Sequence, residues 1–598
     1  MTARPTTPLD EVCNDFVDAS CQLFPELAIS LGRDTGERAF SRFSPDGVRD
    51  HRDLLARTLR LANEAEVRDD VDRITLAALR ESLTSELDCI DAGLTIGEVG
   101  VIATPIQSIR DHFDLMDRDS EDDWATIASH LESVPAAIDE FTEGLASVLA
   151  TEHHPTLVQT RAVIDDLAAQ TSDTGAWMRL ASEYAGTENP HSALLARLRT
   201  AGEAANVRAE QLRRWIETDV LPGARVDDAV GGDVYALRSR GFLGTTIDTD
   251  AAYQWALMRL ADIDRQQRAI ARELYGEGVS VREALERLNH DERYRVHGTA
   301  ALQRWMQDTA DEAMHVLSGT HFTVPDAMRR IECCIAQSGD GSIYYTGPSD
   351  DFSRPGRMWW AVPPGQEVFH TWQEKTTVYH EGMPGHHMQI GVATANRDTL
   401  NDWRRTCWYS GHGEGWALYA EELMDHLGFL ADPAERMGML DAQRLRAARV
   451  IVDIGLHTRR PRLTALERRE VGIDDDTWAD ALASSPFAGV PSVSGEVWTR
   501  EDVWAFMSSN VAMLPSFLAF EVNRYLGWAG QASSYALGQH EWQRCRDLYL
   551  AAHPDASLRD FHDQALTHGG LPLATLPIAL GVEPDPTGVG ASMNAGTR

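Results

Sequence analysis

The sequence contains no long apolar run and no paired cysteines, and these absences narrow the classes of protein it can represent. No stretch of about 18 apolar residues occurs, so no membrane-spanning helix is expected. The opening residues "MTARPTTPLDEVCNDFVDASC" hold no apolar leader segment, and we expect a cytoplasmic protein without a membrane partner. The seven cysteines are scattered and form no C-x-x-C pair, which argues against a disulfide framework or a zinc ribbon.

Basic residues are also scarce, because 55 Lys and Arg stand against 92 Asp and Glu, for a net charge of -37. Such a surface repels phosphate backbones, so nucleic acid is not an expected partner. Hydrophobic residues make up 43% of the 598-residue chain, which is enough to bury a large core. No repeat of fixed period is visible, so a solenoid is not favoured.

What the sequence does contain is mainly helical periodicity. Segments such as "RITLAALRESLTSELDCIDAGL" and "LLARLRTAGEAANVRAEQLRRWIETDVLP" place apolar residues at three- and four-residue steps over residues 10 to about 320. The pattern changes near residue 328, where "MRRIECCIAQ", "GSIYYTGP" and "GRMWWAVPPG" predict a small antiparallel sheet. Helical patterns return near residue 371 and continue to about 580. We therefore expect a mainly α protein with a small β insert.

A histidine–glutamate cluster, "VYHEGMPGHHMQ", follows this insert directly. In an unbroken helix His386 would lie about 240° around the axis from His380, and His387 would lie about 10.5 Å further along. Neither could then share an ion with His380. Pro384 removes a helical hydrogen bond and Gly385 relaxes the backbone, so a break here could return one of the two histidines to His380. The sequence alone leaves open which histidine returns.

A zinc site in a hydrolase needs a third protein ligand. The segment "GHGEGWALYAEELMDHLG" supplies Glu414, which begins a helix among small residues and an aromatic one. A carboxylate in such surroundings is costly to bury unless it is paired or ligated. Glu421 and Glu422, two turns later, are interpreted as part of the solvated face.

These motifs together resemble a known family. "HEGMPGHHMQ", "GEGWALYAEEL", "RVIVDIGLHT", "RYLGWAGQASSYALG" and "FHDQALTHGGLPL" occur in the order typical of the bacterial domain-of-unknown-function family number 885. That family is regarded as a relative of helical zinc metallopeptidases similar to thimet oligopeptidase and angiotensin-converting enzyme. Two departures concern substrate contacts more than the metal cluster: Ala529 stands where the family tends to have proline, and "RRPRLT" replaces an expected Gly-Trp after "GLHT".

The resemblance implies a deep channel in a helical body. Residues 1–325 would form one side of it, residues 326–585 would carry the β insert and the metal site, and residues 586–598 would be a flexible tail. By the same resemblance His380, His386 and Glu414 bind one zinc ion per chain, although another divalent metal is possible. The resemblance favours His386 over His387, and it makes Glu381 the general base.

Five further residues are candidates around this cluster. Tyr535 resembles the tyrosine that late helices of these peptidases direct at the substrate carbonyl, where a phenol can donate to the oxyanion. His457 lies in a family-like motif and could assist the intermediate or orient a ligand. Arg449 and Arg524 could bind a terminal carboxylate through two parallel hydrogen bonds. Tyr345, on the β insert, is a candidate substrate contact, although sheet packing also explains a tyrosine there.

The function we expect is zinc-dependent hydrolysis of short peptides or peptide-like amides. Two alternatives remain open. One is a metal-dependent elimination or hydrolysis of a small molecule in secondary metabolism, because a fold does not fix a reaction. The other is a catalytically inactive helical binding protein, against which Glu381 beside His380 argues. The sequence does not define the substrate or the oligomeric state.

Overall fold

The chain folds mainly into α-helices, which confirms the expected fold class. The computed structural model describes residues 4–33, 38–172, 174–336 and 342–583, so the predicted tail at 586–598 lies outside the described residues. Within these ranges no helix is both long enough and apolar enough to cross a membrane.

Three of the first four helices, α1, α3 and α4, begin at side-chain caps. Thr7 accepts a hydrogen bond from the backbone of Asp10, and the Asp10 carboxylate accepts one from the backbone of Thr7, so two otherwise unpaired N–H groups at the start of α1 are satisfied. Ser44 and Asp69 cap α3 and α4 in a similar way with one side-chain bond each. The first four helices are α1 (Pro8–Leu23), α2 (Pro25–Ser30), α3 (Pro45–Glu64) and α4 (Asp70–Asp91).

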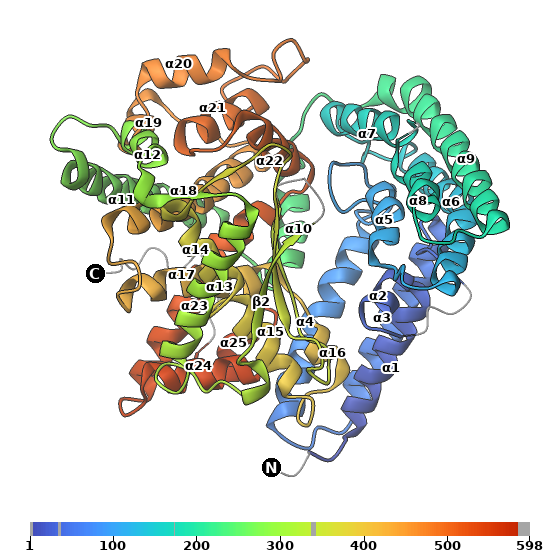
Figure 1. The fold of residues 1–598 in the computed structure, drawn as a ribbon, viewed down its shortest axis with the longest axis horizontal. Helices are drawn as coiled ribbons and strands as arrows, with labels where there is room; N and C mark the ends of the chain where they lie inside the picture. Colours follow the sequence, from blue (N-terminus) through green and yellow to red (C-terminus); the bar gives the residue numbers. More distant parts are fainter. Residues whose placement is uncertain (1–3, 34–37, 173, 337–341, 584–598) are drawn as a thin grey trace.

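The next five helices gather beside the main body, on the right of Figure 1, and have a hydrophobic core of their own. They are α5 (Pro105–Asp111), α6 (Glu121–Val148), α7 (Leu157–Gln170), α8 (Ala176–Ala185) and α9 (Ser192–Trp215). The long periodic segment predicted to end at Pro222 is confirmed as α9 followed by a π turn and a short 3-10 turn. The chain then enters the main body through α10 (Gly232–Leu243), α11 (Thr249–Tyr275), α12 (Val281–Asn289) and α13 (Thr299–Leu317).

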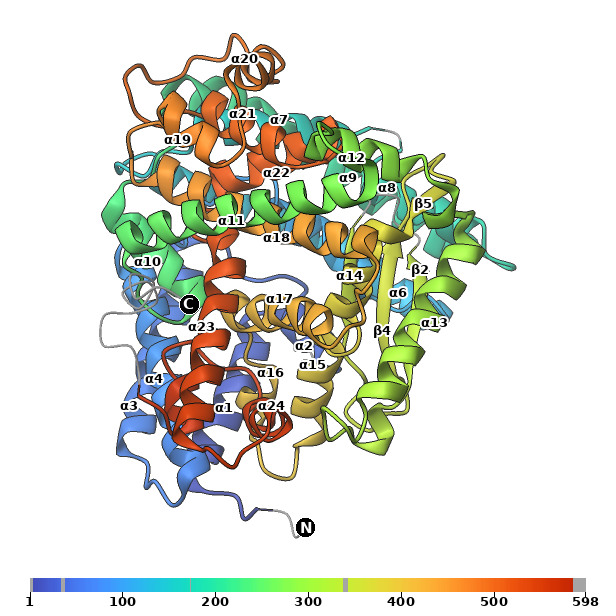
Figure 2. The ribbon, with the colours of Figure 1, turned by 90° about the vertical axis from the view of Figure 1, so that its left-hand side faces the viewer.

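The predicted β insert follows α13. Strands β2 (Ile331–Ala336), β3 (Ile343–Thr346) and β4 (Gly356–Ala361) form a sheet in the order β2-β4-β3, and β1 (Arg295–His297) pairs with β5 (Val368–His370). The β3–β4 and β1–β5 pairs are antiparallel, whereas β2 runs parallel to β4. Helix α13 runs along β2 (Figure 2), and the side-chain amide of Gln307 bonds the strand at the carbonyl of Ile331 and the N–H of Cys333. Helix α13 therefore provides hydrogen-bond partners for backbone groups of β2, a strand at the edge of the sheet.

The remaining helices complete the main body: α14 (Thr371–Glu381), α15 (His386–Ala395), α16 (Asp402–Thr406), α17 (Ser410–His426), α18 (Pro433–His457), α19 (Ala465–Glu470), α20 (Asp475–Ala483), α21 (Arg500–Asn510), α22 (Pro515–Gly527), α23 (Gln531–Ala552), α24 (Leu558–Thr567) and α25 (Leu576–Leu580). One hydrophobic core runs from Leu9 on α1 to Leu580 on α25. The segments on either side of residue 325 thus share this core.

Candidate metal centre

The helix that carries His380 is broken before His386. Such a break is needed if the two histidines are to bind the same ion. Helix α14 ends one residue after His380, and α15 begins at His386. Only glycine fits at position 385, because a Cβ atom on Gly385 would stand 1.9 Å from the carbonyl oxygen of His380. The indole N–H of Trp416 on α17 donates to the carbonyl of Pro384 at 3.0 Å and fixes the break against the neighbouring helix.

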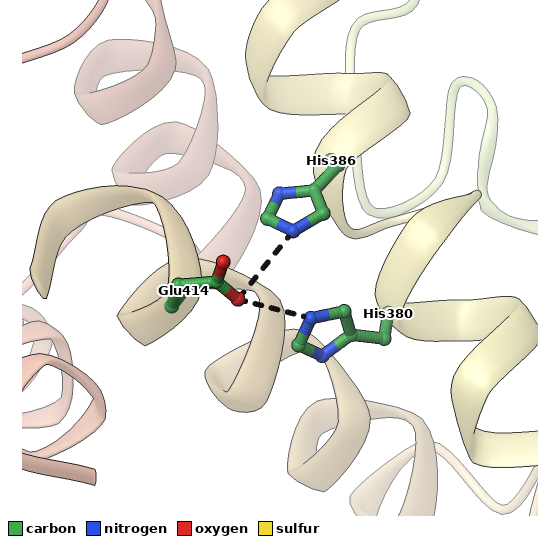
Figure 3. Close-up of side chains that lie close together, drawn as sticks. All are labelled: His380, His386 and Glu414. Carbon is green, nitrogen blue, oxygen red and sulfur yellow. Dashed lines mark hydrogen bonds and ion pairs between the residues drawn. The ribbon is translucent and has the colours of Figure 1, made fainter. Parts of the chain in front are cut away.

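Three polar atoms converge beside this break (Figure 3). Nε2 of His380 lies 3.3 Å from Oε2 of Glu414, and Nε2 of His386 lies 3.7 Å from the same oxygen. One ligand atom from each of the three residues lies within 4.8 Å of the other two. Both histidines are buried, and the side chain of Glu414 is 18% exposed, so one edge of the cluster remains accessible.

This geometry fits a zinc ion. With bonds near 2.05 Å, the donor atoms of a tetrahedral zinc site stand about 3.3 Å apart. The separations of 3.3 and 3.7 Å at Glu414 are close to that value. Two imidazole nitrogens and one carboxylate oxygen are also a ligand set that leaves a fourth position for water in zinc hydrolases. The structure thus brings together the three residues expected as ligands, and their role as ligands stays a prediction.

Glu421 holds His380 from behind. Oε1 of Glu421 lies 2.8 Å from Nδ1 of His380, and the Thr376 hydroxyl donates to the other carboxylate oxygen at 2.6 Å. A proton on Nδ1 directs the lone pair of Nε2 toward Glu414, which is how carboxylates orient histidine ligands in metal sites. The interpretation of Glu421 as a solvated residue was wrong: its side chain is only 1% exposed. Seven residues after Glu414, it lies on the same face of α17 and points at α14.

Glu381 adds a buried carboxylate next to the cluster. It is 7% exposed, and among the described residues no hydrogen bond or ion pair reaches it. Burial raises the pKa of Glu381, while the nearby His386 and His380 act in the opposite direction. Burial also acts on His380, but Glu414 and Glu421 outweigh it and raise the pKa of His380 to about 10. A buried carboxylate without a partner beside the cluster is available for proton transfer.

His387 points away from the cluster. Its Nε2 lies 2.7 Å from the carbonyl oxygen of Met328, so this nitrogen must carry the proton and donate. Its Nδ1 then accepts from the hydroxyl of Tyr345 at 2.8 Å. Both ring nitrogens are therefore occupied, and the geometry agrees with the choice of His386. Tyr345, expected as a substrate contact, uses its hydroxyl to hold His387 instead.

The position of Glu414 depends on backbone-to-backbone packing between α17 and α23. A Cβ on Gly415 would stand 2.4 Å from the backbone of Gly538, and a Cβ on Gly538 would stand 1.9 Å from the carbonyl oxygen of Gly411. This close approach brings Tyr535 on α23 near Glu414. Burial and then the negative charge of Glu414 raise the pKa of the Tyr535 phenol, which keeps it protonated and able to donate.

The two arginines expected to bind substrate share one carboxylate. Arg449 donates to Glu521 at 2.6 Å and to the Tyr525 hydroxyl at 2.7 Å, and its guanidinium lies 5.0 Å from the centre of the Tyr535 ring. Arg524 donates to the same oxygen of Glu521 at 2.8 Å. Burial opposes the charge of Glu521, but the two cations hold the pKa of its carboxyl well below the usual range. Two guanidinium groups with one carboxylate leave a positive charge in excess beside Tyr535.

The comparisons with known proteins identify the family. A family described as bacterial proteins of unknown function (DUF885) matches residues 25–580. The chain belongs to this family. A candidate lipoprotein from Colwellia psychrerythraea has the same fold, with a TM-score of 0.78 at 20% identity over 96% of this chain and 98% of that one. A candidate lipoprotein of unknown function from Shewanella oneidensis also has a similar fold, with a TM-score of 0.68 at 15% identity. The match covers 96% of this chain and 99% of that one. No curated protein matches the sequence.

His457 lies elsewhere in this DUF885 chain. It is fully buried at the end of α18, and its Nε2 lies 2.9 Å from the carbonyl oxygen of Tyr525 and 3.8 Å from the Asp453 carboxylate. Among the described residues, no recorded contact joins it to the three converging side chains. Its expected catalytic role therefore gains no support from its position.

Two residues beside the cluster were misjudged or missed by the sequence reasoning. One is Glu421. The other is Trp408, which is 51% exposed and whose ring centre lies 5.7 Å from that of His386. The absence of a side chain on Gly413 makes room for it, because a Cβ there would stand 2.2 Å from the indole. The heptad spacing from Glu414 could have revealed Glu421, but no sequence signal distinguishes Trp408.

Proposed function

We propose that this chain is a zinc-dependent hydrolase of short peptides or peptide-like amides, related in mechanism to the helical zinc metallopeptidases. The observation that carries the proposal is the convergence of two histidines and Glu414 next to Glu381, a buried carboxylate without a partner. His380, His386 and Glu414 would hold one ion per chain. When bound, zinc supplies Lewis acidity, which acidifies water and polarises a carbonyl group.

The protein's own groups have separable tasks in this reaction. Glu381 accepts the proton of the attacking water and delivers it to the leaving amine. Its buried position beside the cluster, with no hydrogen-bond partner among the described residues, favours this role. The Tyr535 phenol donates to the oxyanion as the carbonyl becomes tetrahedral. Glu421 keeps His380 in the tautomer that presents Nε2.

The proposal is tested by measuring zinc content and turnover in matched variants. Glu414→Ala should lose the ion, because two remaining ligands bind zinc too weakly. Glu381→Gln should keep both zinc and fold while turnover on a library-selected peptide falls by about 10²–10⁴-fold. Full zinc occupancy in Glu414→Ala, or undiminished turnover in Glu381→Gln, would refute the assignment. Zinc binding with activity on small molecules but on no peptide would favour a different metal-assisted reaction.

Cellular location is a separate part of the proposal. The sequence predicts a cytoplasmic protein, whereas the two structural relatives are named as candidate lipoproteins, which favours an envelope location as the alternative. Fractionation of the native cells, followed by immunodetection of this chain, separates the two.

A further inference from the structure

Trp408 differs from the other tryptophans of the chain because half of its surface faces solvent. All sixteen tryptophans lie in the part of the chain that the structure describes, and Trp408, at 51%, is the only exposed one. An indole is the largest apolar side chain, so leaving half of it in water forgoes the stabilisation that burial provides. Single apolar residues on a surface are common, so the contacts of this indole decide what role it has.

The first contact of the indole is with the first turn of α17. Trp408 precedes Tyr409, the N-cap residue of this helix. Its six-membered ring packs on Gly413, where a Cβ atom would stand 2.2 Å from Cη2. Any side chain at position 413 would therefore displace the indole. The next residue on the helix is Glu414, so the indole lies beside one of the three converging residues.

The second contact is with another member of the cluster. The centre of the Trp408 ring lies 5.7 Å from that of the His386 imidazole, and the two planes are tilted by 56°. His386 begins α15, so the indole touches both helices that carry these two residues. The carboxylate of Glu414 keeps 18% of its side chain exposed. Exposed apolar surface therefore begins directly beside the accessible part of the cluster.

A structural role for Trp408 would leave a different pattern, which a nearby tryptophan shows. Trp416, two turns along α17, is fully buried, and its indole N–H donates to the carbonyl of Pro384 at 3.0 Å. Trp408 is half exposed, and among the described residues no hydrogen bond holds its indole N–H. Its ring is held from one side, and the other side is available to a ligand.

We propose that Trp408 contacts the substrate and selects peptides with an aromatic or large apolar side chain next to the scissile amide. This assignment rests on the proposed function, which puts that amide at the three converging side chains. An extended chain advances about 3.3–3.6 Å per residue, so a residue flanking the amide reaches an indole that lies 5.7 Å from His386. Aromatic rings pair best with their centres about 4.5–7 Å apart, which favours a phenyl group on the open side of the indole.

The test uses hydroxamates, which bind zinc directly and are not peptide substrates. The probes are the hydroxamates of N-acetyl-phenylalanine, N-acetyl-alanine and N-acetyl-arginine, and calorimetry measures their affinity for the full zinc-loaded chain. Covering one face of a phenyl ring gives about half the effect of burying it, so the phenylalanine probe should bind about 4- to 12-fold tighter than the alanine probe. Equal affinity for these two would overturn the assignment. Tightest binding of the arginine probe would replace it with recognition of a cation.

Variants separate recognition of the side chain from loss of structure. Trp408→Ala should reduce the ratio of the phenylalanine and alanine affinities to near one, whereas Trp408→Phe keeps an aromatic face and should retain most of it. Phe520→Ala removes another exposed aromatic ring, 45% exposed on α22, and should leave the ratio unchanged. A ratio that falls equally in Phe520→Ala would contradict the role of Trp408.

Fluorescence of the parent chain gives a second measurement that needs no substitution. Because Trp408 is the only exposed tryptophan, acrylamide quenching reports mainly on this residue. The quenched fraction should fall when the phenylalanine probe binds and change little with the alanine probe. An equal quenched fraction with both probes would show that the phenyl group does not cover the indole.

The outcomes also distinguish this assignment from the proposed function. Zinc uptake and peptide hydrolysis with equal affinity for the probes would refute the role of Trp408 alone. A preference for the phenylalanine probe in a chain that hydrolyses no peptide would refute the proposed function, while the contact between Trp408 and the ligand would stand. Failure of the parent chain to bind zinc or any hydroxamate would refute both.

Discussion

Replacing Glu421 with glutamine should weaken zinc binding although this residue touches no metal. Glutamine keeps the size of the side chain and can still accept from Nδ1 of His380, but it lacks the charge that makes His380 a stronger donor. The bond is 2.8 Å long and the carboxylate is only 1% exposed, so water screens it little. Carboxylates in this position contribute about 10- to 100-fold to metal affinity. That factor corresponds to about 1.4–2.7 kcal/mol.

The adjacent residue provides a matched control. Glu422 carries the same charge on the same helix, but its carboxylate accepts from Gln539 at 2.8 Å and from Gln543 at 2.7 Å and does not reach His380. Zinc affinity is measured by competition with a chromophoric chelator for Glu421→Gln, Glu422→Gln and the parent chain. The expected result is a 10- to 100-fold loss in the first variant only. Equal affinity in all three, or an equal loss in both variants, would refute the idea that Glu421 tunes the site through His380.

Three further predictions concern residues around the same site. His386→Ala should abolish zinc binding, whereas His387→Ala should keep most of it, and zinc content checks both variants. His387→Ala should also lower the free energy of unfolding by about 1–3 kcal/mol, because it leaves buried hydrogen-bond partners unpaired, and chemical denaturation measures this loss. Tyr535→Phe should retain zinc and lower turnover by about 10²–10³-fold. Unchanged turnover would show that the Tyr535 hydroxyl does not donate to the oxyanion. Gly538→Ala should lower the melting temperature and zinc affinity together, since a Cβ there would stand 1.9 Å from the carbonyl of Gly411. An unchanged melting temperature would show that α17 and α23 can move apart without loss of stability.

The sequence predicts those parts of the site that are close together along the chain. His380, Pro384 and His386 lie within seven residues, so helix geometry and the effect of proline are enough to show that a break is needed. The helical fold class follows in the same way from local periodicity. The face on which Glu421 lies could not be judged from α17 alone, because burial depends on which helix packs against it.

Contacts between distant segments lay beyond sequence reasoning. Arg449 was expected to be free for a substrate, but it bonds Glu521 on the distant helix α22, and Arg524 bonds the same carboxylate from its own helix. The fully buried position of His457 depends on how α18 packs against the end of α22, where its Nε2 meets the carbonyl of Tyr525. Each of these features depends on tertiary packing, which local pattern does not encode.

The burial of so many ionisable groups at one point favours a functional explanation over a structural one. Glu381, Glu414 and Glu421 place three carboxyl groups around two histidines, which is one more acidic group than basic groups. Helix packing does not require such an arrangement, because well-packed apolar residues usually replace buried ion pairs without loss of stability. In the proposed function, a divalent cation would supply positive charge to these five side chains. The excess of buried acidic groups and the unpaired Glu381 are therefore both consistent with the proposed metal-assisted hydrolase.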